Sequence, residues 1–136
     1  MEIPSDIKKI TMVIGDCISG GSSDNVSFKI KQWQNGNQEE SEDATCETNK
    51  LSYFSKGDTL EWSKTNLGKC NRLQFNGDNS KLYFWILADS GDDFCVSSVE
   101  ITLENEENTT FYKTIAKENK WYDEDTNNRR HTATKN

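Results

Sequence analysis

Hydrophobic residues recur at every second position in several short segments of this chain. Residues 10–14 read Ile-Thr-Met-Val-Ile, and residues 26–30 read Val-Ser-Phe-Lys-Ile. The same alternation returns at 60–62 and at 99–103. A period of two is typical of a β-strand with one buried face, so each of these segments predicts a strand.

Residues 82–88 are apolar throughout, which predicts a central strand buried on both faces. Shorter strands are predicted at 51–54, 73–75 and 111–115. Turn residues separate the strands, for example at 56–58 and 76–78. About eight short strands divided by turns predict an all-β, antiparallel sandwich, and no segment has sustained helical periodicity.

Two polar segments interrupt or follow these strands. Residues 34–45 contain an acidic run and are predicted to form a long exposed loop. Residues 122–136 are polar and are predicted to be a disordered tail. We therefore expect a single domain over residues 1–121, because a chain of 136 residues has the usual size for one core.

Composition and net charge limit the classes of partner that the protein can bind. Only 32% of the residues are hydrophobic, which is low for a globular domain and implies a small core. The net charge of −7 disfavours nucleic acid and a simple anionic membrane, since both require a positive surface. It is compatible with divalent cations and basic partners, although such a charge can also serve only solubility.

The four cysteines predict the redox environment. They are widely spaced with no Cys-x-x-Cys pair, and the single histidine, His131, lies in the polar tail, which disfavours zinc. Two disulfides are favoured over free thiols, and they predict a secreted, extracellular protein. Four cysteines allow three connectivities, which their spacing leaves open.

Two further patterns bear on location. The triplets Asn25-Val26-Ser27 and Asn108-Thr109-Thr110 match the acceptor pattern for N-glycosylation, which also arises often by chance. No apolar run approaches the ~20 residues of a transmembrane helix, so we predict no transmembrane segment.

The inventory of catalytic groups is poor. A serine or cysteine nucleophile needs a base, and His131 lies in the predicted tail. The carboxylates cluster in turns rather than suggesting a glycosidase pair. The glycine-rich stretch at 15–21 precedes no predicted helix and lacks a Gly-Lys-Ser/Thr ending, so it is not a phosphate-binding loop. We therefore predict that the protein is not an enzyme.

Two segments, residues 15–26 and 84–94, carry glycine, aspartate and aromatic motifs, and on these the chain resembles the PLAT domain family, named for polycystin, lipoxygenase and alpha-toxin. Residues 15–26, Gly-Asp-Cys-Ile-Ser-Gly-Gly-Ser-Ser-Asp-Asn-Val, resemble the loop between its first two strands. Residues 84–94, Phe-Trp-Ile-Leu-Ala-Asp-Ser-Gly-Asp-Asp-Phe, are similar to a family motif in which a strand is followed by an Asp/Asn/Gly turn and an aromatic residue. The next strand of the motif corresponds to Val-Glu-Ile at 99–101. Further landmarks match at 54–59, 67–68 and Trp121. The resemblance implies an eight-stranded antiparallel β-sandwich of PLAT type.

The resemblance also implies a calcium site. PLAT domains bind lipid surfaces or proteins, often with calcium held in loops at one end of the sandwich. Calcium requires ~6–8 oxygen ligands from carboxylates and carbonyls. The resembled fold places the two segments at the same end, where we expect ligands from Asp16, Gly20, Asp24, Asp89, Asp92 and Asp93. Ordinary turns are the alternative, since Asp and Gly are common turn residues.

Further candidate residues lie in these two loops and after the strand predicted at 26–30. Cys17 and Cys95 lie in or beside them, so the resemblance favours the pairs Cys17–Cys95 and Cys46–Cys70. Exposed apolar side chains at loop tips are expected to contact a membrane or ligand, and the candidates are Ile18, Trp33 and Phe94.

Together these observations predict a secreted, non-catalytic and calcium-assisted binding module for a lipid surface or a protein partner. Two alternatives stay open. One is a secreted effector, such as an inhibitor, venom component or immune protein, that acts through exposed loops such as 34–45. The other is a calcium-dependent, carbohydrate-binding sandwich.

Overall fold

The computed structural model describes residues 5–15, 21–32, 45–72, 74–75, 81–89, 94–122 and 127–135. This part of the chain is almost entirely β-structure, with one short 3₁₀ helix, η2 (Gly68–Arg72). The strands are β1 (Ser5–Ile14), β2 (Gly21–Gln32), β3 (Thr45–Glu47), β4 (Leu51–Ser55), β5 (Thr59–Trp62), β6 (Gln74–Phe75), β7 (Lys81–Ala88), β8 (Phe94–Glu104), β9 (Thr109–Tyr122) and β10 (Arg130–Lys135).

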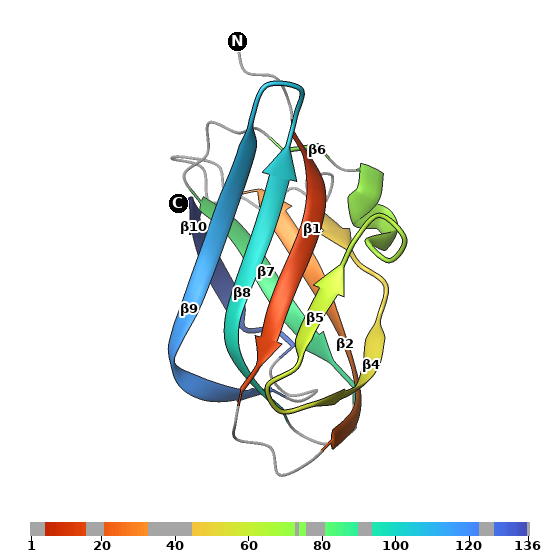
Figure 1. Ribbon diagram of the computed structural model, residues 1–136, viewed down its shortest axis with the longest axis vertical. Helices are drawn as coiled ribbons and strands as arrows, with labels where there is room; N and C mark the ends of the chain where they lie inside the picture. Colours follow the sequence, from red (N-terminus) through yellow and green to blue (C-terminus); the bar gives the residue numbers. More distant parts are fainter. Residues whose placement is uncertain are drawn as a thin grey trace.

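The strands form one antiparallel sheet that curls into a sandwich. The hydrogen-bonded order is β3-β2-β7-β10-β9-β8-β1-β5, and β4 and β6 pair with β2 and β1 beside this path. Figure 1 shows β9, β8, β1 and β5 in the front layer, with β10, β7 and β2 behind them. The β9–β10 ladder joins the two layers along one side. The predicted all-β, eight-stranded antiparallel sandwich is therefore confirmed along this path.

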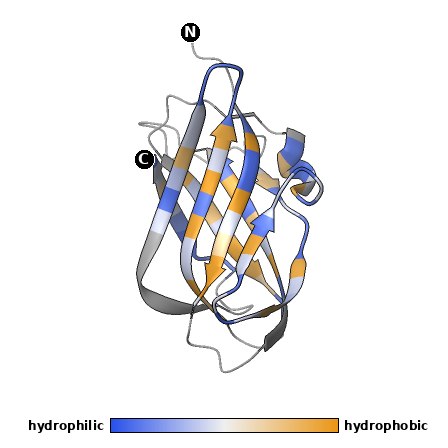
Figure 2. Cartoon of the chain, in the orientation of Figure 1, coloured by the Kyte–Doolittle hydropathy of each residue, from blue (hydrophilic) through white to orange (hydrophobic). Residues whose placement is uncertain are grey.

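The predicted alternation places the core between the two layers. Ile10, Met12 and Ile14 of β1 are buried, as are Val26, Phe28 and Ile30 of β2. Figure 2 shows the corresponding alternation of hydrophobic and hydrophilic positions along β1 and β8. The outer face of β2 differs from expectation, because Ser27 and Lys31 are buried there rather than solvated.

Strand β7 is central, as its continuous apolar run predicts. It lies between β2 and β10 and directs Leu82, Phe84, Ile86 and Ala88 into the core. On the opposite face Trp85 is also buried, and the Lys29 ammonium lies 4.3 Å from the centre of its ring. Cation–π contact of this kind allows a long polar side chain to cover an aromatic ring.

The side of the sandwich opposite β9 and β10 is closed by specific contacts. A disulfide joins Cys46 of β3 to Cys70 of η2, with the Cα atoms 4.9 Å apart, which confirms this predicted pair. Closing a loop with a sequence separation of 24 is worth about 3 kcal/mol. Beside it, Gly68 has a φ of 58°, and a Cβ there would lie 2.9 Å from the Asn49 Oδ1 atom. Glycine is therefore required at this approach.

The predicted tail is wrong for residues 130–135, which form β10 between β7 and β9. The physical reason is that few of its side chains need to be apolar. Ala133 is completely buried, and the His131 ring stacks on Phe84 with centroids 5.1 Å apart. On the outer face, the Arg130 guanidinium lies 4.3 Å from the Tyr83 ring centre. Backbone pairing to β7 supplies the remaining stabilisation.

Within the described residues, no helix is long and apolar enough to cross a membrane.

The position of β10 predicts that Ala133→Asp lowers the free energy of unfolding by at least about 3 kcal/mol, because it buries an unpaired charge. The matched control is Thr134→Asp, at an exposed neighbour in the same strand, which should change it by less than about 0.5 kcal/mol. Urea denaturation followed by tryptophan fluorescence measures both. Equal stability of the two variants would contradict the placement of β10 inside the sheet.

Candidate functional site

The candidate site lies at the end of the sandwich where β1 and β7 finish and β2, β5 and β8 begin. We call it the Asp89 end and define it by residues 14–15, 21, 25, 50–59, 88–89 and 94–95. It is the lower end in Figure 1. Backbone hydrogen bonds hold its parts together: Ile14 N donates to Asp58 O at 2.8 Å, and Gly15 N donates to Cys95 O at 2.9 Å. These backbone hydrogen bonds fix the positions of the strand ends from which the side chains of the site extend.

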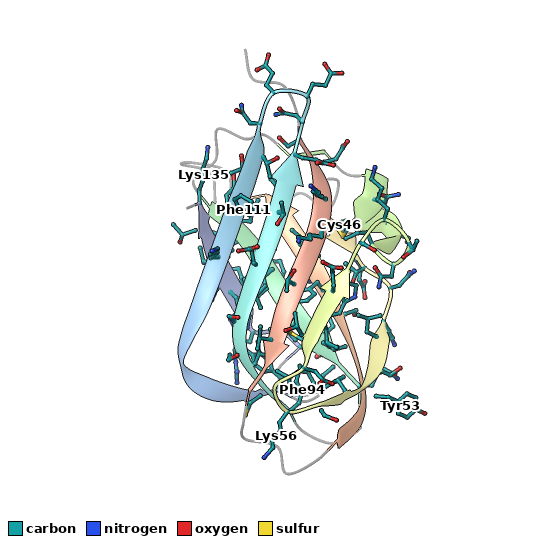
Figure 3. The ribbon with its side chains drawn as sticks, in the orientation of Figure 1. Cys46, Tyr53, Lys56, Phe94, Phe111 and Lys135 are labelled. Atoms are coloured by element: carbon teal, nitrogen blue, oxygen red, sulfur yellow. A yellow bond between two sulfur atoms is a disulfide. The ribbon has the colours of Figure 1, made fainter. Side chains whose placement is uncertain are left out.

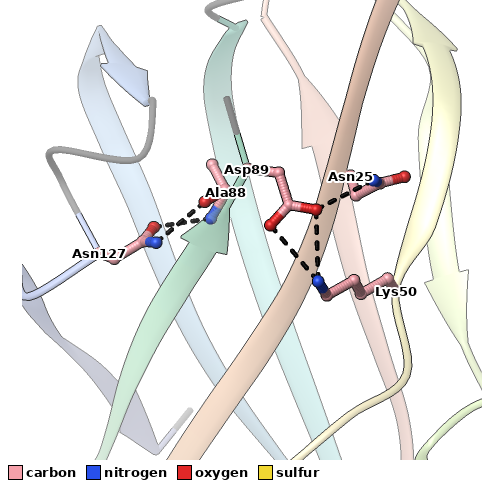
Figure 4. A network of polar contacts seen from close by, with 5 residues as sticks. All are labelled: Asn25, Lys50, Ala88, Asp89 and Asn127. Carbon is pink, nitrogen blue, oxygen red and sulfur yellow. Dashed lines mark hydrogen bonds and ion pairs between the residues drawn. The ribbon is translucent and has the colours of Figure 1, made fainter. Parts of the chain in front are cut away.

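Asp89 follows directly after β7 and is held by two donors (Figure 4). The Asn25 amide nitrogen donates to Asp89 Oδ2 at 2.9 Å. The Lys50 ammonium lies 3.3 Å from Oδ2 and 3.4 Å from Oδ1. The Asn25 hydrogen bond, followed by the Lys50 contact, lowers the pKa of Asp89 below its ordinary value. Both side chains of the ion pair are substantially exposed, so the pair contributes only about 0.2–1 kcal/mol.

A second contact in Figure 4 comes from the segment expected to be a tail. The Asn127 side chain donates from its amide nitrogen to Ala88 O at 2.9 Å and accepts from Ala88 N at 2.7 Å. This two-point contact reproduces the pairing of a neighbouring strand just before β10 begins. The sequence signal for it is slight, since an isolated asparagine in a polar segment is ordinarily read as part of a loop.

Of the predicted calcium ligands, only Asp89 has its side chain within the described residues. Its oxygens contact the Asn25 amide nitrogen and the Lys50 ammonium. The described residues contain no group of three or more His, Cys, Asp or Glu side chains that could hold a metal ion. Asp16, Gly20, Asp92 and Asp93 lie outside the described residues, and Asp24 is described only by its backbone in β2. The calcium site therefore stays a prediction.

The predicted contact at Phe94 is wrong. Its side chain is completely buried, edge-on to Phe54 with centroids 5.0 Å apart and stacked on Tyr122 at 5.9 Å. Phe94 is the first residue of β8, and its side chain points into the core. Ile18 and Trp33 lie outside the described residues. Cys95 is buried and disulfide-bonded, and its predicted partner Cys17 also lies outside them.

The exposed aromatic at this end is Tyr53 of β4, whose side chain is 85% exposed. Its φ is 60°, and it is the only non-glycine residue with positive φ in the described part of the chain. A bulky residue rarely adopts this conformation, which costs about 1–3 kcal/mol. Figure 3 shows Tyr53 and Lys56 projecting away from the body of the protein at this end.

The conformation of Tyr53 follows from a register shift between β4 and β2. Ser22 pairs with Phe54 but Asn25 pairs with Ser52, so two residues of β2 lie opposite Tyr53 alone. Strict alternation would place Leu51 and Phe54 on opposite faces, whereas Phe54 is buried and Leu51 packs against the core. The left-handed residue allows both to face inward and leaves Tyr53 outside. The sequence gives no indication of this, because the pattern at 51–54 reads as an ordinary short strand.

The charges around Tyr53 are balanced. Lys50 and Lys56 are exposed, and Asp58 and Asp89 provide two carboxylates at the same end. Asp58 also fixes the β4–β5 turn by accepting a hydrogen bond from Ser55 N at 2.8 Å. The described part of this surface therefore presents an aromatic ring with as many carboxylates as ammonium groups, rather than a basic patch, and one ion pair joins Lys50 to Asp89.

Comparison with known proteins gives no family assignment. No protein-family model matches the sequence, and neither does any curated protein. Among solved structures, two crystal structures of lipoxygenase (LOX) variants are similar, with TM-scores of 0.49 and 0.48 and sequence identities of 13% and 12%. Each match covers 96% of this chain and 16% of the LOX chain. This chain thus spans about a sixth of the length of those proteins.

The strain at Tyr53 predicts that Tyr53→Gly stabilises the protein. Removing the side chain relieves about 1–2 kcal/mol of left-handed strain, and the greater freedom of unfolded glycine offsets about 0.5–1 kcal/mol. We expect a net gain of ~0.5–1 kcal/mol in denaturant unfolding. Ser52→Gly, at the exposed neighbouring position with ordinary φ, should instead lose about 0.5–1 kcal/mol. A loss in both variants would show that Tyr53 is not strained.

Proposed function

We propose that this protein is a non-catalytic binding module that docks on a lipid surface through the Asp89 end. The observation that carries the proposal is Tyr53, an aromatic side chain that is 85% exposed at a position where its backbone is unfavourable. A feature that costs stability persists when it serves another purpose. Tyrosine suits the membrane interface because it has an apolar ring and a polar tip.

The surrounding charges favour a zwitterionic surface. With Lys50 and Lys56 balanced by Asp58 and Asp89, the described part of this end has no net positive charge to attract anionic lipid. The overall charge of −7 argues in the same direction. The resemblance of the sequence to PLAT domains supports the same class of function, because these domains bind lipid surfaces or proteins. A protein partner is therefore the alternative to a lipid surface.

The proposal includes calcium only as an ion bound by residues other than Asp89. Because Asp89 is held by Asn25 and Lys50, the ligands proposed for calcium are the other predicted residues, Asp16, Gly20, Asp24, Asp92 and Asp93. The contacts of the described residues give calcium no role in binding. The vesicle experiment therefore includes calcium as a separate condition.

An extracellular location and the absence of catalysis complete the proposal. The Cys46–Cys70 disulfide supports an oxidising compartment. The single histidine supports a non-catalytic role, because the His131 ring is stacked on Phe84 and its Nε2 atom lies 3.3 Å from the Tyr122 hydroxyl. These contacts give His131 a structural role in holding β10.

Sedimentation with phosphatidylcholine vesicles tests the proposal. We expect the wild-type protein to bind and Tyr53→Ser to partition about tenfold more weakly, which corresponds to ~1.4 kcal/mol. Phe111→Ser is the matched control, since Phe111 is 39% exposed on β9, away from the Asp89 end, and should bind as the wild type does.

The same sedimentation is run in EDTA and in millimolar calcium. Stronger binding in calcium would support these predicted residues as calcium ligands, and equal binding would remove calcium from the proposal. A wild-type protein that binds no vesicle in either condition would refute the lipid surface and leave a protein partner as the form to pursue.

A further inference from the structure

The two N-glycosylation triplets of the sequence lie in very different surroundings. Asn108 is at the tip of the β8–β9 hairpin, and Asn25 is inside β2. An acceptor asparagine must present its side-chain nitrogen to a large donor and afterwards keep a bulky glycan in solvent. The structure can therefore distinguish the two sites where the sequence pattern cannot.

Asn108 meets this requirement. It is exposed, as are the adjacent Glu106, Glu107 and Thr109. Asn105 forms the turn: its carbonyl oxygen Oδ1 accepts from the backbone nitrogens of Glu107 and Asn108, both at 2.8 Å. The Asn108 side chain takes no part in these contacts. A glycan can therefore be added to it without removing a hydrogen bond that holds the hairpin.

The hairpin is also anchored independently of Asn108. The Asn105 amide nitrogen donates to Ser5 Oγ at 3.0 Å, which ties the turn to β1. Asn105 N donates to Asn108 O at 2.9 Å through the backbone alone. A change of the Asn108 side chain should therefore leave the turn intact, which makes Asn108→Gln a usable variant.

Asn25 fails the same requirement. Its side-chain nitrogen, the atom that would carry the sugar, already donates to Asp89 Oδ2 at 2.9 Å. The next two residues of its triplet, Val26 and Ser27, are buried within β2, which pairs with both β4 and β7. A glycan on Asn25 would abolish the hydrogen bond and place a sugar against packed strands.

We propose that Asn108 is an N-glycosylation site and that Asn25 is not. The reaction joins the Asn108 side-chain nitrogen to the anomeric carbon of an oligosaccharide supplied by a lipid-linked diphosphate donor. The carbon–oxygen bond to the diphosphate breaks, the lipid diphosphate leaves, and the amide nitrogen gives up one proton. The inference rests on the extracellular location in the proposed function, but not on lipid binding.

The position of the site is compatible with the candidate binding surface. In Figure 1 the β8–β9 hairpin lies at the upper end of the sandwich, and the Asp89 end lies at the lower end. A glycan on Asn108 would therefore extend away from Tyr53 and leave the Asp89 end accessible.

Secretion of the full chain from cultured eukaryotic cells, behind a cleavable leader, tests the proposal. We expect one N-linked glycan, released by peptide-N-glycosidase in heavy-oxygen water with the isotope incorporated at position 108. Asn108→Gln and Thr110→Val should remove the glycan, whereas Thr110→Ser, which keeps the acceptor pattern, should retain it. Asn25→Gln and Ser27→Ala should leave the glycan mass unchanged.

A secreted wild-type chain without a glycan would overturn the proposal, provided that a reporter glycoprotein from the same cells is modified. A glycan that disappears with Asn25→Gln would also overturn it. Circular dichroism of Asn108→Gln checks that the variant is folded. Protein refolded from bacteria carries no glycan, and its binding to vesicles is measured on its own. Failure of the lipid proposal can therefore be distinguished from failure of the glycosylation proposal.

Discussion

The sandwich depends on closure of the side where β5 and β4 meet without a ladder between them in the described part of the chain. Trp62 of β5 bridges this gap, because its ring packs edge-on against Phe28 of β2 with centroids 4.9 Å apart. Its indole nitrogen donates to Asn49 O at 3.0 Å. The Cys46–Cys70 disulfide fixes β3 to η2 on the same side. With only 32% hydrophobic residues, the chain combines a small core with a covalent link and a buried aromatic pair.

This closure also determines what the Asp89 end can present. The β4–β5 turn is held to β1 by hydrogen bonds from Ile14 N to Asp58 O and from Gly57 N to Ile14 O. Strand β4 is held to β2 by a ladder with a register shift, which forces Tyr53 outward. The aromatic side chain is thus fixed on a rigid strand rather than on a loop, and this reduces the entropy lost when it binds a surface.

The sequence predicted the parts of the fold that follow from local periodicity. Alternation located the buried faces of β1 and β2, and the continuous apolar run located β7 as a central strand. Local periodicity could not locate β10, since a strand that buries only Ala133 and part of His131 has the composition of a polar tail. Nor could it predict the left-handed Tyr53, because that conformation arises from pairing with β2, which is remote in sequence.

The candidate site was predicted less well for the same reason. The sequence predicts Asp89 as a metal ligand but does not predict its contacts with Asn25 and Lys50, whose proximity depends on tertiary structure. Phe94 was expected to be exposed because it follows a polar loop, yet strand β8 begins at this residue and turns it inward. Position beside a turn did not determine which face the side chain occupies.

The central claim is that the Asp89 end is the surface that meets a lipid bilayer. Hydrogen–deuterium exchange of the intact protein, with and without phosphatidylcholine vesicles, tests it most directly, because it reports contact along the whole backbone without altering a residue. We predict slower exchange over residues 50–58 in the presence of vesicles and unchanged exchange over the hairpin at 105–109. Protection confined to the hairpin, or unchanged exchange at 50–58 in protein that sediments with the vesicles, would contradict it.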